Sequence, residues 1–243
     1  MGSLIIAKRF CGPHTSANGG YFAGMVAALA QRAPLTSQPH SIQSVRLKAP
    51  PPLDTELAVV ALADGGIEVR DGERLIGSGS PATLNLSVPP PVEYREAVEA
   101  SRNYVGFANH RFPTCFVCGV DRTPGDGLCI FAGAVAGRDI VAAPWTPDAS
   151  LDGGDGMIRP EFMSAVLDCP GYYAVTPDDR MMLLAQFTAQ LDRPVRVGEP
   201  CVVIGWGIGS NGPKHEAGTA LYGSDGELRG RARALWVEPR MTR

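Results

Sequence analysis

The chain has 243 residues, of which 44% are hydrophobic and 19% are charged, a composition typical of a globular protein with an ample core. Its net charge of −3, from 22 basic and 25 acidic residues, argues against the strongly basic surface of a nucleic-acid-binding protein. No apolar run approaches the roughly 20 residues of a membrane-spanning helix. Residues 1–8 also lack the length and cleavage site of a signal peptide. We therefore expect a cytoplasmic protein that contacts neither nucleic acid nor membrane.

The first half predicts one buried helix followed by antiparallel strands. Residues 18–32 are nearly all small or apolar, which is typical of a helix buried on every side, and Ser16 or Asn18 can cap it. From Ser41 onward the apolar residues recur at every second position, and turn sequences such as Asp71-Gly72 separate short strands. The predicted strands are 4–9 before the helix, and 42–47, 57–62, 67–70 and 75–86 after it.

The second half predicts the same order of elements. A proline-rich connector over 88–109 contains a polar, helix-compatible stretch at 93–102. A second helix is expected over 157–167, with Pro160 in its first turn and Cys169-Pro170-Gly171 ending it. The predicted strands of this half are 128–131, 140–145, 181–191, 201–208, 215–222 and 228–237.

The six cysteines are too few for a disulfide scaffold in a chain of this size. Cys115-Phe116-Val117-Cys118-Gly119 contains the only close pair. A zinc site would need a second pair at similar spacing, so the motif favours a structural tight turn, with a metal site or a redox pair as alternatives. We predict no metal and no cofactor.

The two predicted helices resemble each other at an offset of 140 residues, which aligns Phe22 with Phe162. The copies differ at two positions. Gly20 of the first copy aligns with Pro160, whereas Ala28 aligns with Asp168 of the second. One copy therefore offers free backbone N–H groups and the other offers a carboxylate, which predicts a single composite active site.

Three motifs resemble those of double hotdog proteins of the acyl-CoA thioesterase superfamily. They are Cys115–Gly119 followed by Pro124–Leu128, the stretch Glu161–Asp168, and the Asn18-Gly19-Gly20-Tyr21 turn. The resemblance implies an α+β fold in which two tandem hotdog repeats each wrap a curved antiparallel sheet around a long central helix. The implied boundaries are 1–87 for the first repeat, 88–109 for a linker and 110–243 for the second repeat.

The resemblance also implies hydrolysis of an acyl-CoA or acyl-carrier-protein thioester, with CoA present only as part of the substrate. The N–H groups of Gly20 and Tyr21 are expected to stabilise the oxyanion, since a helix N-terminus favours negative charge. Asp168 lies in an apolar setting that raises the pKa of a carboxyl group, which suits a general base or nucleophile.

Further residues are predicted to bind the substrate, although each also has an ordinary structural interpretation: His14, Asn18, Gly19, Tyr172, Gln186 and Thr188. Two other functions remain open at this point. A non-catalytic acyl-thioester-binding protein would have lost turnover, and a hotdog hydratase or dehydratase would need a histidine that the second helix lacks. The substrate is expected to be the main partner, and two double hotdogs can pair as a homodimer.

Overall fold

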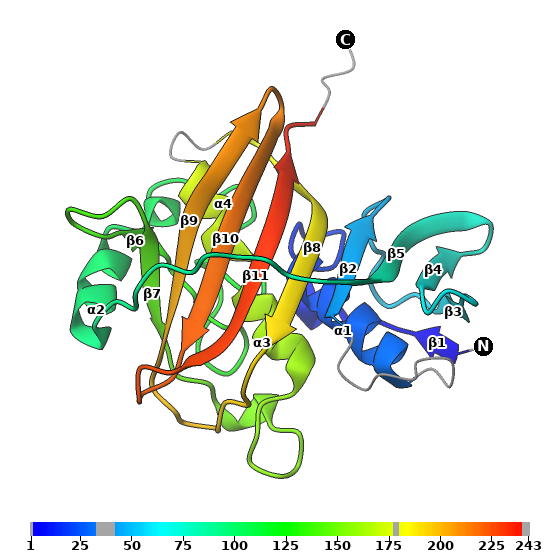
Figure 1. Cartoon of the computed structure of the whole chain (residues 1–243), viewed down its shortest axis with the longest axis horizontal. Helices are drawn as coiled ribbons and strands as arrows, with labels where there is room; N and C mark the ends of the chain where they lie inside the picture. The colour runs from blue at the N-terminus through cyan, green and yellow to red at the C-terminus, as the bar shows by residue number, and fades with distance from the viewer. Residues whose placement is uncertain (1, 33–41, 177–179, 240–243) are drawn as a thin grey trace.

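The computed structural model describes residues 2–32, 42–176 and 180–239, and within them eleven strands form one antiparallel sheet (Figure 1). The order across the sheet is β1-β3-β4-β5-β2-β8-β11-β10-β9-β7-β6. The strands of the first half are β1 (Gly2–Leu4), β2 (Ile42–Leu47), β3 (Leu57–Ala61), β4 (Ile67–Asp71) and β5 (Arg74–Ala82). Those of the second half are β6 (Gly133–Ala134), β7 (Val141–Trp145), β8 (Leu183–Leu191), β9 (Cys201–Asn211), β10 (Lys214–Tyr222) and β11 (Leu228–Val237).

The two sets of strands meet along one short seam between β2 and β8. Only three residue pairs form it, centred on Val45 opposite Phe187. Each of these strands is the first to follow the helices of its half, so the seam brings the helices together as well. The strands of residues 2–82 therefore lie on one side of the seam and those of residues 133–237 on the other.

Three helices pack on the same face of the sheet (Figure 1). α1 (Gly19–Arg32) lies against β2, β5 and β8 and runs beside α3 (Pro160–Val166), whereas α4 (Cys169–Val175) lies against β9 and β10. The main core lies between these helices and the sheet and contains the fully buried side chains of Phe22, Phe162 and Phe187. No helix in the described ranges combines the length and apolarity needed to cross a bilayer.

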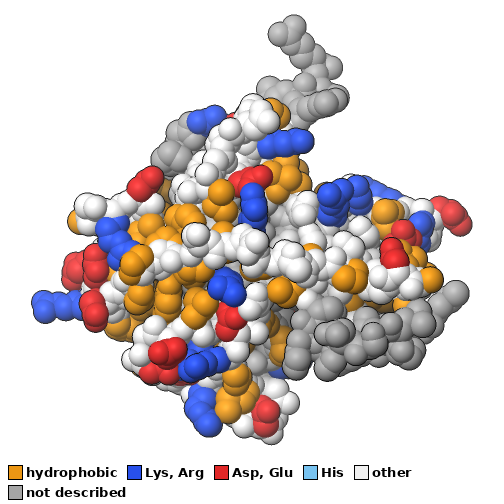
Figure 2. Space-filling model, viewed as in Figure 1, with side chains coloured by type: hydrophobic (Ala, Val, Ile, Leu, Met, Phe, Trp, Pro, Cys, Tyr) orange, Lys and Arg blue, Asp and Glu red, His pale blue; other side chains and the backbone are white. Residues whose placement is uncertain are grey.

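The segment between β5 and α2 (Tyr94–Arg102) crosses the outer face of the sheet, over β8, β11 and β10 (Figure 1). The hydroxyl of Tyr222 on β10 donates a hydrogen bond to the carbonyl of Pro89 in this connector, at 2.6 Å. A second core forms beneath α2, where Ile204 and Trp206 of β9 pack with Ala97. Figure 2 shows hydrophobic side chains gathered on this face between α2 and β10. The first six residues of β9, Cys201–Trp206, are therefore buried on both faces, which explains why this part of the strand is so apolar.

Two of the predicted strands were wrong. Residues 128–131 do not form a strand, because the N–H groups of Leu128 and Ile130 bond to Phe116 and Val117 in the preceding loop. The predicted strand 4–9 is replaced by the short strand β1 and by a 3₁₀ turn at Lys8–Phe10. The helix predicted over residues 93–102 is confirmed as α2.

Candidate active site

Asp168 lies at a break between two helices. The sequence predicted one helix over 157–167 that ends at Cys169-Pro170-Gly171, whereas in the structure these three residues begin a second helix. α3 ends at Val166, and α4 begins at Cys169 with Pro170 in its first turn. Proline has no N–H, and inside a continuous helix its ring would collide with the carbonyl four residues earlier, which is that of Val166. Pro170 therefore forces the interruption but is tolerated at the start of a new helix. The interruption leaves Asp168 as the residue that precedes α4.

Glycine residues on α1 allow the two halves to approach closely at this break. A Cβ atom on Gly20 would lie 2.5 Å from the Cβ of Asp168 and 2.9 Å from the carbonyl oxygen of Ser164. One turn later, a Cβ on Gly24 would lie 2.7 Å from the Cα of Glu161. Residues four apart share one face of a helix. The Gly20/Gly24 face of α1 therefore sets how near the Asp168 carboxylate comes to the start of α1.

One oxygen of the Asp168 carboxylate is held by two donors from the first half of the chain. Its Oδ2 accepts hydrogen bonds from the N–H of Gly20 at 2.9 Å and from Nδ2 of Asn18 at 2.7 Å. The other oxygen, Oδ1, is buried and has no hydrogen-bond partner among the described residues. An unpaired buried carboxylate oxygen is costly. Oδ1 can therefore accept a hydrogen bond from a water molecule or a substrate.

The pKa of the Asp168 carboxyl is raised from 3.8 to about 7, mainly by burial and to a smaller extent by the charge of the nearby Cys115. The hydrogen bonds from Gly20 and Asn18 act in the opposite direction, because they stabilise the ionised form. The side chain is only 2% exposed. A carboxyl group that titrates near neutral pH can both accept and return a proton, which is what a general acid–base catalyst needs.

The first amides of α1 are used differently from what the sequence predicted. The N–H of Tyr21 donates to Oδ1 of Asn18 at 2.9 Å, so Asn18 caps the helix. Because the N–H of Gly20 is bonded to Asp168, both predicted oxyanion donors already have acceptors. The Tyr21 ring is buried and stacks on Phe10. By contrast, no group in the described part of the chain accepts the N–H of Gly19, the first amide of the helix.

Asp168 opens onto a cavity of about 470 Å³ that both halves line. Asn18 and Gly19 line it at the start of α1, and Tyr172 lines it from α4. The apolar wall is formed by Leu47, Ala49, Tyr172, Tyr173, Met181, Met182, Leu183, Leu184 and Trp236. The indole N–H of Trp236 is buried without a partner in the described structure, so it is a further donor available to a bound molecule.

Gln186 and Thr188 were predicted to bind substrate, but the structure turns both away from the cavity. They lie on β8 and bond to the hydroxyl of Ser44 across the seam, at 2.7 and 3.0 Å. Residues two apart in a strand share a face, and Phe187 between them faces the core. Both side chains therefore hold the seam together on the opposite face of the sheet.

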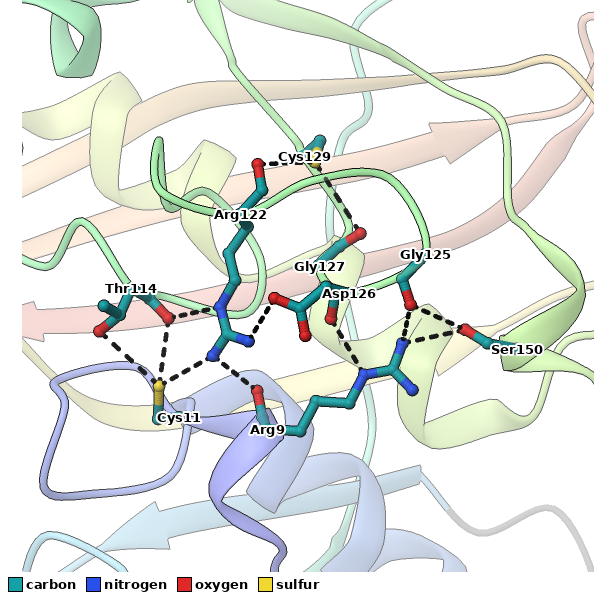
Figure 3. A network of polar contacts seen from close by, with 9 residues as sticks. All are labelled: Arg9, Cys11, Thr114, Arg122, Gly125, Asp126, Gly127, Cys129 and Ser150. Carbon is teal, nitrogen blue, oxygen red and sulfur yellow. Dashed lines mark hydrogen bonds and ion pairs between the residues drawn. The ribbon is translucent and has the colours of Figure 1, made fainter.

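His14 is also excluded from this cavity. It is exposed and lines a separate surface hollow of about 450 Å³, together with Lys8, Arg9 and Arg122. Figure 3 shows Arg9 and Arg122 with the groups that they contact. Arg122 donates to the carbonyls of Thr114 and Arg9 and pairs with Asp126. Arg9 donates to the carbonyls of Gly125 and Asp126. The network fixes the loop before α1 against the loop that carries Cys115.

The sequence did not reveal which groups surround the Cys115–Cys118 turn. Cys169, next to Asp168, lies with its sulfur 3.9 Å from that of Cys115. His110 donates through Nε2 to the carbonyl of Cys118 at 2.9 Å and accepts the N–H of Phe112 at Nδ1, which defines its tautomer. Tyr104 and Tyr173 share a hydrogen bond of 2.6 Å beside them. Only tertiary packing brings these groups together.

Comparisons with known proteins give the fold but not a named relative. No protein-family model matches the chain, and no curated protein matches it. A protein assigned as a thioesterase in Novosphingobium aromaticivorans superposes with a TM-score of 0.63 at 11% identity, covering 98% of this chain and 94% of its own. The tesB protein of Mycobacterium avium subsp. paratuberculosis gives 0.59 at 13% identity, covering 92% and 87%. A hot dog fold protein of unknown function from Alicyclobacillus acidocaldarius gives 0.57 at 10% identity, covering 99% and 93%.

The fold of the chain is therefore the hotdog fold. The chain shares with solved thioesterase and hotdog structures an antiparallel sheet packed against helices over nearly its whole length. At these identities the likeness shows the fold alone, and any activity has to be argued from the site itself.

Proposed function

We propose that this protein hydrolyses acyl thioesters of CoA or of an acyl carrier protein, with Asp168 as the general base. The observation that carries the proposal is the state of the Asp168 carboxylate. One oxygen is held by Asn18 and Gly20, the other has no partner among the described residues, and Asp168 lines an apolar cavity. A carboxylate fixed at one oxygen and available at the other is suited to removing a proton from a bound water molecule.

In this mechanism Asp168 Oδ1 takes a proton as the water oxygen forms a bond to the thioester carbonyl carbon. The negative charge that develops on the carbonyl oxygen is stabilised at the N-terminus of α1, where the N–H of Gly19 is available and the helix dipole is favourable. The tetrahedral intermediate then breaks its carbon–sulfur bond. Asp168 returns its proton to the leaving sulfur, and the products are a carboxylic acid and a thiol.

The cavity accounts for both ends of such a substrate. The apolar wall that includes Met182 and Tyr173 suits an acyl chain or an aryl group. Lys48 and Arg111 lie exposed on the cavity lining, where they are suitable contacts for the phosphates of CoA. The proposed steps use only water, Asp168 and the helix N-terminus, so no resident cofactor is part of this proposal. A cytoplasmic location is part of the same proposal.

The sheet topology supports the proposal that the chain is a double hotdog, with repeats at 1–87 and 110–243 joined by the segment 88–109. The seam between β2 and β8 separates the strands of these two ranges, and each range supplies one side of the site. Gly20 comes from the first range and Asp168 from the second. We also predict that two such chains associate as a homodimer.

Hydrolysis of an acyl-CoA panel tests the function directly. Short, medium, long and aryl thioesters are incubated with the protein, and the released thiol is measured colorimetrically. We expect turnover on at least one class, with kcat/KM at least a hundredfold above that of a variant that lacks the base, as is typical of general-base catalysis. Absence of turnover across the panel would contradict the assignment.

A non-catalytic acyl-thioester-binding protein is the second candidate, and one observation favours it. The N–H groups of Gly20 and Tyr21 already have acceptors inside the protein, so only the Gly19 amide is left at the helix start for an oxyanion. Equilibrium binding of the same esters distinguishes the two functions. Saturable binding without thiol release would support the second candidate.

The pH dependence of the reaction should report the ionisation of Asp168. Because the base must be deprotonated, kcat/KM is expected to rise with pH through a midpoint near 7. Asn18→Ser keeps a helix cap but removes the amide that stabilises the ionised carboxylate, so the midpoint should move upward. A lost charge-assisted hydrogen bond of about 1.5 kcal/mol corresponds to about one pH unit.

Asn85→Ser, at an exposed position far from the site in sequence, is the matched control and should leave the midpoint unchanged. An Asn18→Ser profile that coincides with that of the unmodified protein would show that Asn18 only caps α1. Because serine retains the cap, thermal unfolding should then also change little.

A further inference from the structure

The sulfur atoms of Cys115, Cys118 and Cys169 form a buried cluster that the proposed hydrolysis does not use. All three lie within 4.8 Å of one another, and all six cysteines of the chain are free thiols. Cys11, Cys129 and Cys201 lie outside this cluster. Three thiols therefore meet at one point, although Cys169 is 51 positions beyond Cys118 in the sequence.

The spacing of the cluster fits metal coordination better than a disulfide. A zinc–sulfur distance of about 2.3 Å in a tetrahedral site places two sulfur atoms about 3.8 Å apart. The Cys115 and Cys169 sulfurs are 3.9 Å apart, whereas a disulfide requires about 2.05 Å. A metal ion at the centre would need only small side-chain rotations to reach the third sulfur.

The Cys115–Gly119 turn is built in a way that directs two sulfurs to the same side. The N–H of Gly119 closes the turn on the carbonyl of Cys115 at 2.9 Å. A Cβ at position 119 would lie 2.4 Å from the carbonyl oxygen of Pro113, so the turn requires glycine there.

The cluster lies beside the cavity that Asp168 lines. Each of the three cysteines lines the 470 Å³ cavity with Asn18 and Asp168. Nδ2 of Asn18 lies 3.9 Å from the sulfur of Cys115 and 2.7 Å from Oδ2 of Asp168, so the carboxylate is one side chain away. Both ring nitrogens of His110 are bonded to backbone groups of the same loop, so His110 supports the turn and is not a ligand.

We propose that Cys115, Cys118 and Cys169 bind one thiophilic d¹⁰ metal ion, with Zn²⁺ as the expected ion. Three thiolates occupy three tetrahedral positions, and the fourth position opens toward the cavity beside Asp168. Three protein ligands with one open position is the arrangement of a zinc site that is accessible to water or substrate. The site goes beyond the proposed hydrolysis, because ion binding is measured without any thioester.

The test starts from full-length protein that has been reduced and stripped of metal with a chelator. Zn²⁺ is titrated in competition with a chromophoric chelator, and Co²⁺ is added separately as a spectroscopic probe. We expect one ion per chain and an intense thiolate-to-cobalt charge-transfer absorption. Cys115→Ser and Cys169→Ser should each weaken Zn²⁺ binding at least tenfold and reduce this absorption, since each removes one thiolate.

Cys129→Ser is the matched control, because Cys129 is half-exposed outside the cluster, and it should bind Zn²⁺ as the unmodified protein does. X-ray absorption of the zinc-loaded unmodified protein needs no variant and should show three sulfur ligands at about 2.3 Å. The proposal is wrong if the unmodified protein binds Zn²⁺ no more tightly than Cys169→Ser does. An X-ray absorption spectrum that shows only oxygen and nitrogen ligands around the zinc ion would also overturn the proposal. Neither result depends on whether the protein hydrolyses thioesters.

Discussion

Asp168→Asn is expected to abolish thioester hydrolysis while making the folded protein more stable above pH 7. Asparagine has the same shape, and its carbonyl oxygen can accept the hydrogen bonds from Gly20 and Asn18 that Oδ2 accepts in the unmodified protein. It cannot remove a proton from water. Loss of a general base typically costs two to four orders of magnitude in rate.

The gain in stability follows from the raised pKa of Asp168. Because the pKa is 3.8 for the ordinary group and about 7 in the folded protein, the native state holds this proton more tightly than the unfolded chain does. The stability that this proton supplies is fully present below pH 4 and is lost as the pH rises through 7. At 1.36 kcal/mol per pKa unit, the ionised carboxyl costs about 4 kcal/mol above pH 7, and asparagine avoids this cost.

Thermal unfolding of both proteins between pH 4 and pH 8 measures this effect. The melting temperature of Asp168→Asn should exceed that of the unmodified protein by an amount that grows with pH and levels off above pH 7. Both proteins are treated with chelator, so that a metal at the cysteine cluster contributes to neither. Asp139→Asn, at an exposed position, is the control and should change neither property. Full activity in Asp168→Asn would remove the basis of the mechanism.

Gly20→Ala is expected to lower both stability and activity, because the added methyl group has no space. Its Cβ would lie 2.5 Å from the Cβ of Asp168 and 2.9 Å from the carbonyl oxygen of Ser164, and the second of these is fixed backbone. Overpacking of this kind costs about 1–3 kcal/mol, partly offset by the greater helix preference of alanine. Relief of the clash must move Asp168 away from α1, so kcat/KM should fall at least tenfold.

Chemical denaturation and the hydrolysis assay together measure the effect of Gly20→Ala. Gly209→Ala is the matched control, since a Cβ there meets nothing within 4 Å and the backbone is not in the left-handed region. The control should behave as the unmodified protein does in both assays. If Gly20→Ala had the same denaturation midpoint and the same hydrolysis rate as the unmodified protein, the close approach of the two halves would not be needed for activity.

The position of the first helix could be predicted from the sequence, because the necessary information is local. Residues 18–32 contain a cap followed by small and apolar side chains, and α1 is observed at Gly19–Arg32. The pairing of Gly20 with Asp168 came from comparing the two halves at an offset of 140 residues, and the structure brings them into hydrogen-bond contact at 2.9 Å. The catalytic roles of these residues remain proposals.

What the sequence could not provide was the environment of these residues. Pro170 signals the end of a helix, but the same residue is also allowed in the first turn of the next helix, so the break at Asp168 had two interpretations. Because side chains alternate between the two faces of a sheet along a strand, the sequence shows that Gln186 and Thr188 share a face. Whether this face points to the core or away from it depends on the register with β2. The approach of Cys169 to Cys115 likewise depends on how α4 is placed against a distant loop.

The narrow seam between β2 and β8 has a consequence for how preparations of this protein should be judged. The hydrogen bond from Gly20 to Asp168 joins the helices of the two halves, whose strands meet in a contact only three residue pairs long. Partial separation there would disrupt the site while most of the sheet hydrogen bonds survive, and circular dichroism would register little change. Thioester turnover per molecule is therefore a more sensitive gauge of quality than secondary-structure content.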